Sequence, residues 1–150
     1  IHAICAYGVD LVTLSMWASN PRQYVLFHKA RTEGDFSRLM ENVSGLVNQA
    51  QDDGHTKIKL YHVVCHLNAQ GLVDMVNLAK KLSVDYLEFA VIDVVKGKTE
   101  TLMLTQQDRE SLKRQIYHLA CEKEYLGHGG VDLVDQIHSD NVNELGGSMR

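Results

Sequence analysis

Short apolar runs alternate with longer amphipathic stretches along this chain. The runs lie at residues 10–16, 57–65 and 85–92, and each is rich in aliphatic and β-branched side chains. Compact apolar runs of this length are typical of β-strands that are buried on both faces of a sheet. The pattern therefore predicts three buried strands.

The stretches between the runs carry apolar side chains at helical spacing. In the clearest one, Asp35 is the candidate N-cap and Gly54 ends the helix. Its buried face has seven members, which are Phe36, Leu39, Met40, Val43, Leu46, Val47 and Ala50. Apolar residues at these intervals form one stripe along a helix, so this stretch is predicted to pack against the sheet.

Helix-start signals precede the other amphipathic stretches. Asn20-Pro21 joins a capping residue to a proline that the first turn tolerates. Asn68 follows the second run and can cap the next helix, and Thr105 and Asp108 have the spacing of a capping box. The elements therefore alternate as strand, helix, strand, helix, strand, helix.

This alternation predicts the topology. The connections are helical and too long for hairpins, and helical crossovers require parallel strands joined with right-handed connections. We therefore expect an α/β fold with three parallel strands in chain order and all helices on the outer side.

The length and the net charge limit the size of the domain and the kinds of partner to be expected. A chain of 150 residues with 45 % hydrophobic residues suits one globular domain, and is too short for a complete eight-stranded barrel of about 250 residues. The net charge of −4 argues against binding to a nucleic-acid backbone. No apolar stretch approaches the roughly 20 residues of a membrane span, so no membrane partner is expected.

Cysteine and histidine spacing gives no metal motif. Cys5, Cys65 and Cys121 are far apart in the sequence, so they form no local thiolate site. Sparse, odd-numbered cysteines indicate a reduced, cytoplasmic protein. His62 and His66 are four residues apart, but on a strand this spacing separates them by about 13 Å, so we reject them as a zinc pair.

Candidate chemistry lies where the predicted strands end, because parallel α/β sheets bind ligands at the carboxyl ends of their strands. Ser15, His66, Asn68 and Asp93 are placed there, with Trp17 close by. Each also has a structural interpretation. The serine can satisfy a backbone group, the asparagine can cap a helix, the aspartate can be a solvated loop residue, and the tryptophan can anchor the short helix.

Three blocks of sequence share an order and spacing with a known family. The first joins Gly8-Val9-Asp10 to a strand ending in Ser15, the second is Val63–Asn68 followed by a helix, and the third runs from Asp85 to Thr105. Together they resemble the middle of a radical S-adenosylmethionine (radical SAM) enzyme. The resemblance covers residues 3–124, and the closest subgroup has a cysteine-rich auxiliary-cluster (SPASM-type) extension.

The resemblance implies that this chain is a fragment. Residues 1–124 would be the second half of a partial (βα)6 TIM-like barrel, and residues 125–150 a linker or short helical extension. The chain opens like the tail of an amphipathic helix, and the family's CxxxCxxC motif for a [4Fe–4S] cluster is absent from it. We therefore expect a missing N-terminal half of the barrel, and an isolated chain that binds no cluster and is inactive.

The resemblance also implies an activity. The intact enzyme would cleave S-adenosylmethionine reductively to a 5′-deoxyadenosyl radical, which abstracts hydrogen from an unknown substrate. The implied cofactor-binding residues are Ser15, Asn68, Val91 and Ile92. The implied residues on the substrate side are Trp17, His66 and Asp93. No catalytic residue and no metal ligand of this chain is assigned.

Two other classes of function stay open. One is a fragment of a different βα-barrel enzyme, aldolase-like or metal-dependent, which needs a lysine or a ligand cluster at the strand ends. The nearest lysines, Lys96 and Lys98, are in a loop. The other is a non-catalytic βα domain that binds a partner through an exposed sheet edge.

Overall fold

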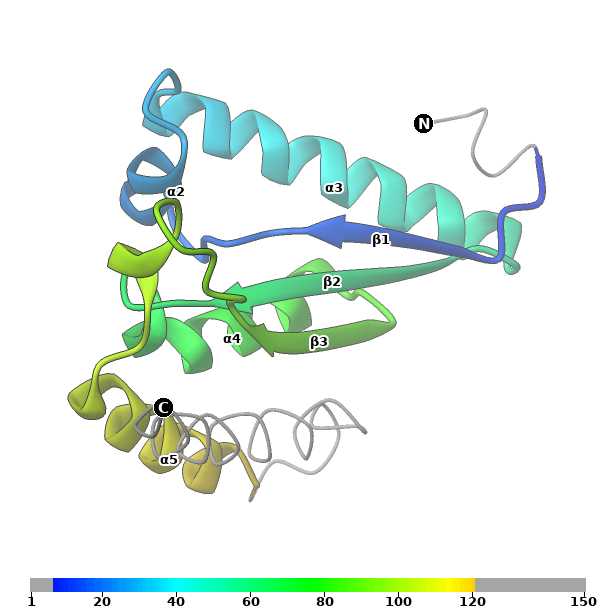
Figure 1. Cartoon of the computed structure of the whole chain (residues 1–150). Helices are drawn as coiled ribbons and strands as arrows, with labels where there is room; N and C mark the ends of the chain where they lie inside the picture. The colour runs from blue at the N-terminus through cyan, green and yellow to red at the C-terminus, as the bar shows by residue number, and fades with distance from the viewer. Residues whose placement is uncertain (1–6, 121–150) are drawn as a thin grey trace.

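The computed structural model describes residues 7–120, in which strands and helices alternate (Figure 1). The strands are β1 (Leu11–Ser15), β2 (Lys57–Val64) and β3 (Tyr86–Val91). The α-helices are α2 (Pro21–Phe27), α3 (Glu33–Asp53), α4 (Leu72–Leu82) and α5 (Gln106–Ala120). Two short 3-10 helices, η1 (Ala69–Gly71) and η2 (Glu100–Leu102), follow β2 and β3.

The three strands form one parallel sheet in the order β1-β2-β3. Leu60 at the centre of β2 is level with Leu14 on one side and Leu87 on the other. Strand positions, parallel pairing and sequential order are therefore confirmed, with each strand starting and ending within about a residue of its apolar run.

The sheet has one covered face and one open face. Along β2 the buried residues Ile58, Leu60, His62 and Val64 alternate with more exposed neighbours. Helices α3 and α4 connect consecutive strands, and α4 contacts both α3 and α5. Right-handed crossovers in a sequential sheet place such helices on the same face. The expectation of strands buried on both faces is therefore wrong, because the helices cover only one.

The hydrophobic core lies between the covered face and the helices. Helices α3, α4 and α5 contribute fully or nearly fully buried side chains, among them Val43, Leu46, Val47, Met75, Val76, Ala79, Leu112 and Leu119. Burying each of these larger aliphatic side chains contributes about 1.5–3 kcal/mol. This packing fixes the carboxyl ends of the strands relative to one another.

Helix α3 begins before the predicted cap. Thr32 is the N-cap. The carboxylate of Asp35 accepts hydrogen bonds from the backbone N of Thr32 at 2.8 Å and from Thr32 Oγ1 at 2.9 Å. The assignment of Asp35 as N-cap is wrong, because it is the third helical residue of a capping box that Thr32 opens. The helix ends as predicted at Gly54, whose φ of 69° is the left-handed conformation that glycine favours.

Two other helix starts are confirmed. Asn20 Oδ1 accepts a hydrogen bond from the backbone N of Gln23 at 2.9 Å at the start of α2. At the start of α5, Thr105 Oγ1 accepts from the backbone N of Asp108 at 3.2 Å, and the Asp108 carboxylate accepts from the backbone N of Thr105 at 2.9 Å. The predicted opening helix tail, the expected extension at 125–150, Cys5 and Cys121 lie outside the described residues.

Candidate functional site

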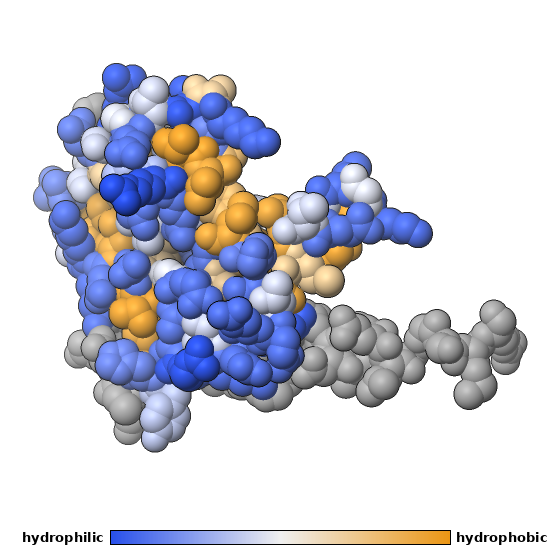
Figure 2. Space-filling model, turned by 90° about the vertical axis from the view of Figure 1, so that its left-hand side faces the viewer, coloured by the Kyte–Doolittle hydropathy of each residue, from blue (hydrophilic) through white to orange (hydrophobic). Residues whose placement is uncertain are grey.

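The carboxyl ends of the three strands meet at one rim of the sheet, which Figure 2 views face on. All the site residues predicted from the sequence lie at this rim or at the ends of the strands. These residues are Ser15, Trp17, His66, Asn68, Val91, Ile92 and Asp93. Their side chains differ in how far they reach the surface.

Ser15 and Trp17 are brought together. Ser15 is the last residue of β1, is exposed, and is level with Tyr61 on the open face. The indole Nε1 of Trp17 donates to Ser15 Oγ at 3.2 Å. The indole also packs edge-on against Phe27, with ring centroids 5.5 Å apart. This pair gives the rim an accessible hydroxyl beside an anchored aromatic ring.

Asn68 has a different environment. It is 2 % exposed, and its Oδ1 accepts from the backbone N of Cys65 at 2.7 Å. Its Nδ2 donates to the carbonyls of Trp17 at 2.9 Å and Val63 at 2.8 Å. It precedes η1 as expected, but its side chain does not cap that helix. Because both amide hydrogens are used within the fold, this side chain ties the end of β2 to the loop after β1.

Val91 and Ile92 belong to the end of β3. Val91 packs against the core and is level with Val64, and Ile92 is 9 % exposed with its backbone N donating to Val64 O at 2.9 Å. Asp93 is exposed and starts the loop to η2, where its carbonyl accepts from Thr99 Oγ1 at 3.1 Å. Val91 therefore belongs to the covered face at the end of β3, Ile92 is nearly buried, and Asp93 is exposed.

His66 is half-exposed at the rim and is paired with an aspartate from a distant element. Its Nδ1 lies 2.7 Å from Asp108 Oδ2, and the side chains are 47 % and 6 % exposed. Burial opposes ionisation of Asp108, but hydrogen bonds from Thr105 and His66 outweigh it and lower the pKa of the carboxyl. Asp108 is therefore ionised at neutral pH, so Nδ1 of His66 carries the proton and donates it.

The open face below the rim carries polar groups in register. Tyr61 lies between Ser15 and Glu88, and Lys59 lies one row lower. Lys59 Nζ is 2.7 Å from Glu88 Oε2, and the two side chains are 23 % and 42 % exposed. Sequence reasoning missed this cluster, although the alternation of Lys57 and Lys59 with apolar residues is the signal of a strand covered on one face only.

Apolar side chains surround these polar groups. Nine large apolar residues are clearly exposed in the described part of the chain, and five come from the connections at this rim. They are Leu26, Leu67, Val94, Val95 and Met103. Figure 2 shows apolar patches separated by polar surface across this face. Apolar exposure concentrated at one end of a sheet is typical of a contact surface.

Metal ligation has no support within residues 7–120, where no group of three or more His, Cys, Asp and Glu side chains could hold an ion. His62 is on the covered face, where its Nδ1 is 2.7 Å from Met16 O, whereas His66 is at the rim. Cys65 is a buried free thiol whose pKa is raised by burial. None of the helices described is long and apolar enough to cross a membrane.

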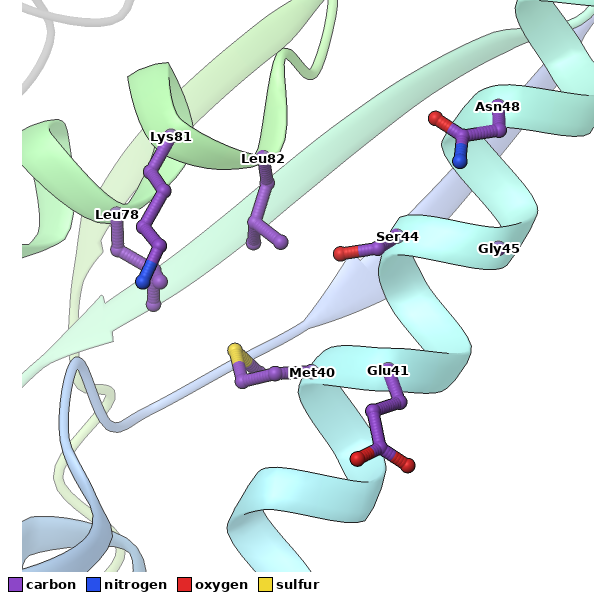
Figure 3. A pocket seen from close by; sticks show the side chains of 8 residues that line it. All are labelled: Met40, Glu41, Ser44, Gly45, Asn48, Leu78, Lys81 and Leu82. Atoms are coloured by element: carbon purple, nitrogen blue, oxygen red, sulfur yellow. The ribbon is translucent and has the colours of Figure 1, made fainter.

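A separate groove of about 520 Å³ lies between α3 and α4 (Figure 3). Its lining is Met40, Glu41, Ser44, Gly45, Asn48, Leu78, Lys81 and Leu82. Lys81 and Glu41 come from different helices and do not point at each other in Figure 3. The groove therefore lacks the convergent polar groups that the rim and the open face offer.

No protein-family model matches this sequence, and no curated protein is significantly similar to it. On its geometry alone, the candidate site consists of the rim with its histidine–aspartate pair, together with the polar open face beneath it.

Proposed function

We propose that this chain supplies three consecutive βα units of a partial (βα)6 barrel in a radical S-adenosylmethionine enzyme. The observation that carries the proposal is the exposed hydroxyl of Ser15, at the carboxyl end of β1, on the open face of a sequential parallel sheet. Such barrels repeat a unit of one strand and one helix, which gives a sequential parallel sheet with helices on one side. The block resemblance supplies the choice of family.

The residues on the open face support the proposal of a barrel. Lys59, Tyr61 and Glu88 lie on the side of the sheet that faces inward in a βα barrel. Within residues 7–120, β1 and β3 each have one unpaired edge. Free edges and a bare face favour further strands, so we propose that another part of the same barrel pairs with this sheet. We also propose a cytoplasmic location, with which the free thiol of Cys65 agrees.

The residues at the rim fit the proposed cofactor in part. When bound, S-adenosylmethionine supplies the hydrogen-abstracting group by reductive cleavage. The Ser15 hydroxyl would hydrogen-bond its ribose or methionyl group, and Val91 and Ile92 would stand near its adenine. Asn68 fits less well, because its amide is occupied by backbone groups and its role here is to hold the loops. Trp17, His66 and Asp93 would face the substrate.

The [4Fe–4S] cluster does not fit the described residues. Cys65 is the described cysteine, and it is buried with its thiol pKa raised, whereas a ligand must be an accessible thiolate. The cluster ligands would have to come from another part of the barrel. In this proposal the described residues therefore contribute cofactor and substrate contacts only.

The test uses the full product of the gene, purified without oxygen, supplied with iron and sulfide and reduced with dithionite. We expect bound cluster and formation of 5′-deoxyadenosine from S-adenosylmethionine. Ser15→Ala should weaken cofactor binding by about fivefold, the equivalent of a hydrogen bond of about 1 kcal/mol, with cluster content unchanged. Thr13→Ala, exposed on the same strand face one row lower, is the matched control. A protein with neither cluster nor 5′-deoxyadenosine would overturn the proposal.

Lys59 favours a second candidate, a lysine-dependent βα-barrel enzyme. It lies within a strand on the open face and is only 23 % exposed, as an amine that forms a Schiff base with a carbonyl substrate would be. Its Nζ lies 2.7 Å from Glu88 Oε2, so a carbonyl substrate would have to displace that carboxylate to reach it. Borohydride trapping with small aldehydes and ketones, followed by peptide mass spectrometry, tests this candidate. Reduction confined to Lys59 and absent at Lys57 would support it, and equal labelling of the two would exclude it.

A further inference from the structure

Two histidine–aspartate pairs occur in the described residues, and they differ in the ring nitrogen that is engaged and in the burial of the carboxylate. His55 Nε2 is 3.0 Å from Asp10 Oδ1, with side chains 56 % and 90 % exposed. His66 Nδ1 is 2.7 Å from Asp108 Oδ2, with side chains 47 % and 6 % exposed. The two histidines are similarly accessible, but only His66 has a buried carboxylate as its partner.

The carboxylate of Asp108 is held in place. Its Oδ2 accepts from Thr105 Oγ1 at 2.6 Å and from the backbone N of Thr105 at 2.9 Å, as well as from His66. The backbone of His66 is fixed as well, since its N donates to Leu102 O at 2.9 Å. The backbone of His66 and one nitrogen of its ring are therefore both held in place.

This orientation leaves one ring nitrogen for other chemistry. Because Nδ1 donates its proton to Asp108, the neutral ring has a lone pair at Nε2. Within residues 7–120, no hydrogen bond engages that nitrogen. It lies at the rim, where Leu67 and Met103 expose apolar surface at 41 % and 46 %.

We propose that His66 is a proton-transfer residue for a ligand bound at this rim, and that Asp108 is its positioning residue. Nε2 takes the proton of a hydroxyl, thiol or amine on a ligand with an apolar body. The bonding electron pair stays on the ligand atom, and the ring becomes an imidazolium that the Asp108 carboxylate stabilises. Water then removes the proton from Nε2. The proposal does not depend on S-adenosylmethionine.

The competing explanation is that the pair only ties the start of α5 to the loop after β2. A tie of this kind needs the Nδ1 hydrogen bond but makes no demand on the reactivity of Nε2. The discriminating measurement is therefore the behaviour of Nε2 itself, with His55 as the control inside the same molecule.

The experiment treats the full chain with diethyl pyrocarbonate, at a pH alkaline enough to keep both imidazoles neutral. Mass spectrometry of the peptides then gives the acylation rate of each histidine. We expect His66 to react about threefold or more faster than His55, because a buried carboxylate raises the electron density of its ring. Asp108→Asn should lower the His66 rate to about that of His55, whereas Asp10→Asn should leave both rates unchanged. Equal rates in the wild type, or no effect of Asp108→Asn, would overturn the proposal.

A second measurement needs no variant at position 108, where loss of the helix cap could unfold the chain. Long-range ¹H–¹⁵N NMR spectra identify which nitrogen of a neutral histidine carries the proton. We expect the proton of His66 on Nδ1, with His66→Gln identifying the signal. A proton on Nε2 would refute the proposal, because that nitrogen would then have no lone pair to accept with. Both readouts are independent of 5′-deoxyadenosine formation, so this proposal and the radical-enzyme proposal can fail separately.

Discussion

The two faces of the sheet differ in both burial and charge. On the covered face, Leu60 and His62 are at most 1 % exposed. On the open face, Lys59 and Glu88 are 23 % and 42 % exposed and form an ion pair. Leu60 follows Lys59 directly in β2, so successive residues of one strand belong to opposite environments.

The covered face therefore determines mainly the stability of the fold, and the open face and the rim determine what the protein can bind. The covered face is where the strands and helices bury apolar surface, which is the main source of the folding free energy. The open face and the rim hold the ionisable side chains that are accessible to a ligand. Substitutions on the first should therefore unfold the chain, and substitutions on the second should change what it binds.

The largest expected effect comes from the covered face. Leu60→Ala should lower the free energy of unfolding by about 2–5 kcal/mol, because it opens a cavity at a site with no exposure. Val63→Ala, in the same strand but on the open face, should cost about 1 kcal/mol or less. Urea unfolding followed by circular dichroism measures both. Similar losses for the two variants would mean that the open face is packed as tightly as the covered one.

His62 should make the covered face sensitive to acid. Burial lowers the pKa of His62 from 6.5 to about 4, against a smaller opposing effect of its hydrogen bond to Met16 O. The folded state therefore prefers neutral His62. Its contribution is complete above pH 6.5, falls as pH drops from 6.5 to about 4, and reaches a loss of about 3 kcal/mol. The Nε2 atom has no hydrogen-bond partner in the described residues, so protonation gains no compensating contact.

The measurement compares urea unfolding of the wild type and of His62→Leu at several pH values. The difference in unfolding free energy between them should change by about 3 kcal/mol over this interval, since other titrating groups are common to both proteins. A difference that stays constant with pH would show that His62 is accessible to solvent.

Asn68 is buried and holds the loops at the rim, so its substitution should cause an intermediate loss of unfolding free energy. Asn68→Ala leaves the backbone N of Cys65 and the carbonyls of Trp17 and Val63 without their partner in a buried site. We expect a loss of about 2 kcal/mol. Asn77→Ala, at an exposed position of α4, is the matched control and should change stability by about 0.5 kcal/mol or less. If Asn68→Ala leaves stability intact, the side chain is available to a ligand after all.

Much of the fold follows from local sequence, because apolar periodicity and helix caps act over a few residues. The parallel order of the strands and the capping box of Thr105 and Asp108 could be predicted in this way. The start of α3 is ambiguous in the sequence because two acceptable caps, Thr32 and Asp35, lie within four residues. The nearly one-sided burial of β1 was missed, since Leu11 and Leu14 look equally apolar in the sequence although only Leu14 packs against the core.

The site was harder to predict than the fold. Ser15 and His66 could be nominated because the carboxyl end of a strand is a local feature. The partner of His66 could not, since Asp108 is 42 residues away and has a sufficient local explanation as a helix cap. The same holds for the pair of Lys59 and Glu88, which are 29 residues apart and meet only through the register of β2 and β3.

The smallest expected effect is on the open face, and it tests the proposed barrel most directly. Glu88→Gln removes the ion pair with Lys59, and in this chain we expect a loss of at most about 1 kcal/mol that shrinks in high salt, because both groups are in contact with solvent. If another part of the barrel covers this face in the full gene product, the same change would leave Lys59 buried without a partner. The loss there should rise to about 3–5 kcal/mol and no longer depend on salt. Unfolding of both proteins with and without the substitution measures the difference, with Glu110→Gln on the exposed side of α5 as the control. Equal small losses in the two proteins would mean that the open face stays open, and that Lys59 and Glu88 form a polar surface rather than a barrel interior.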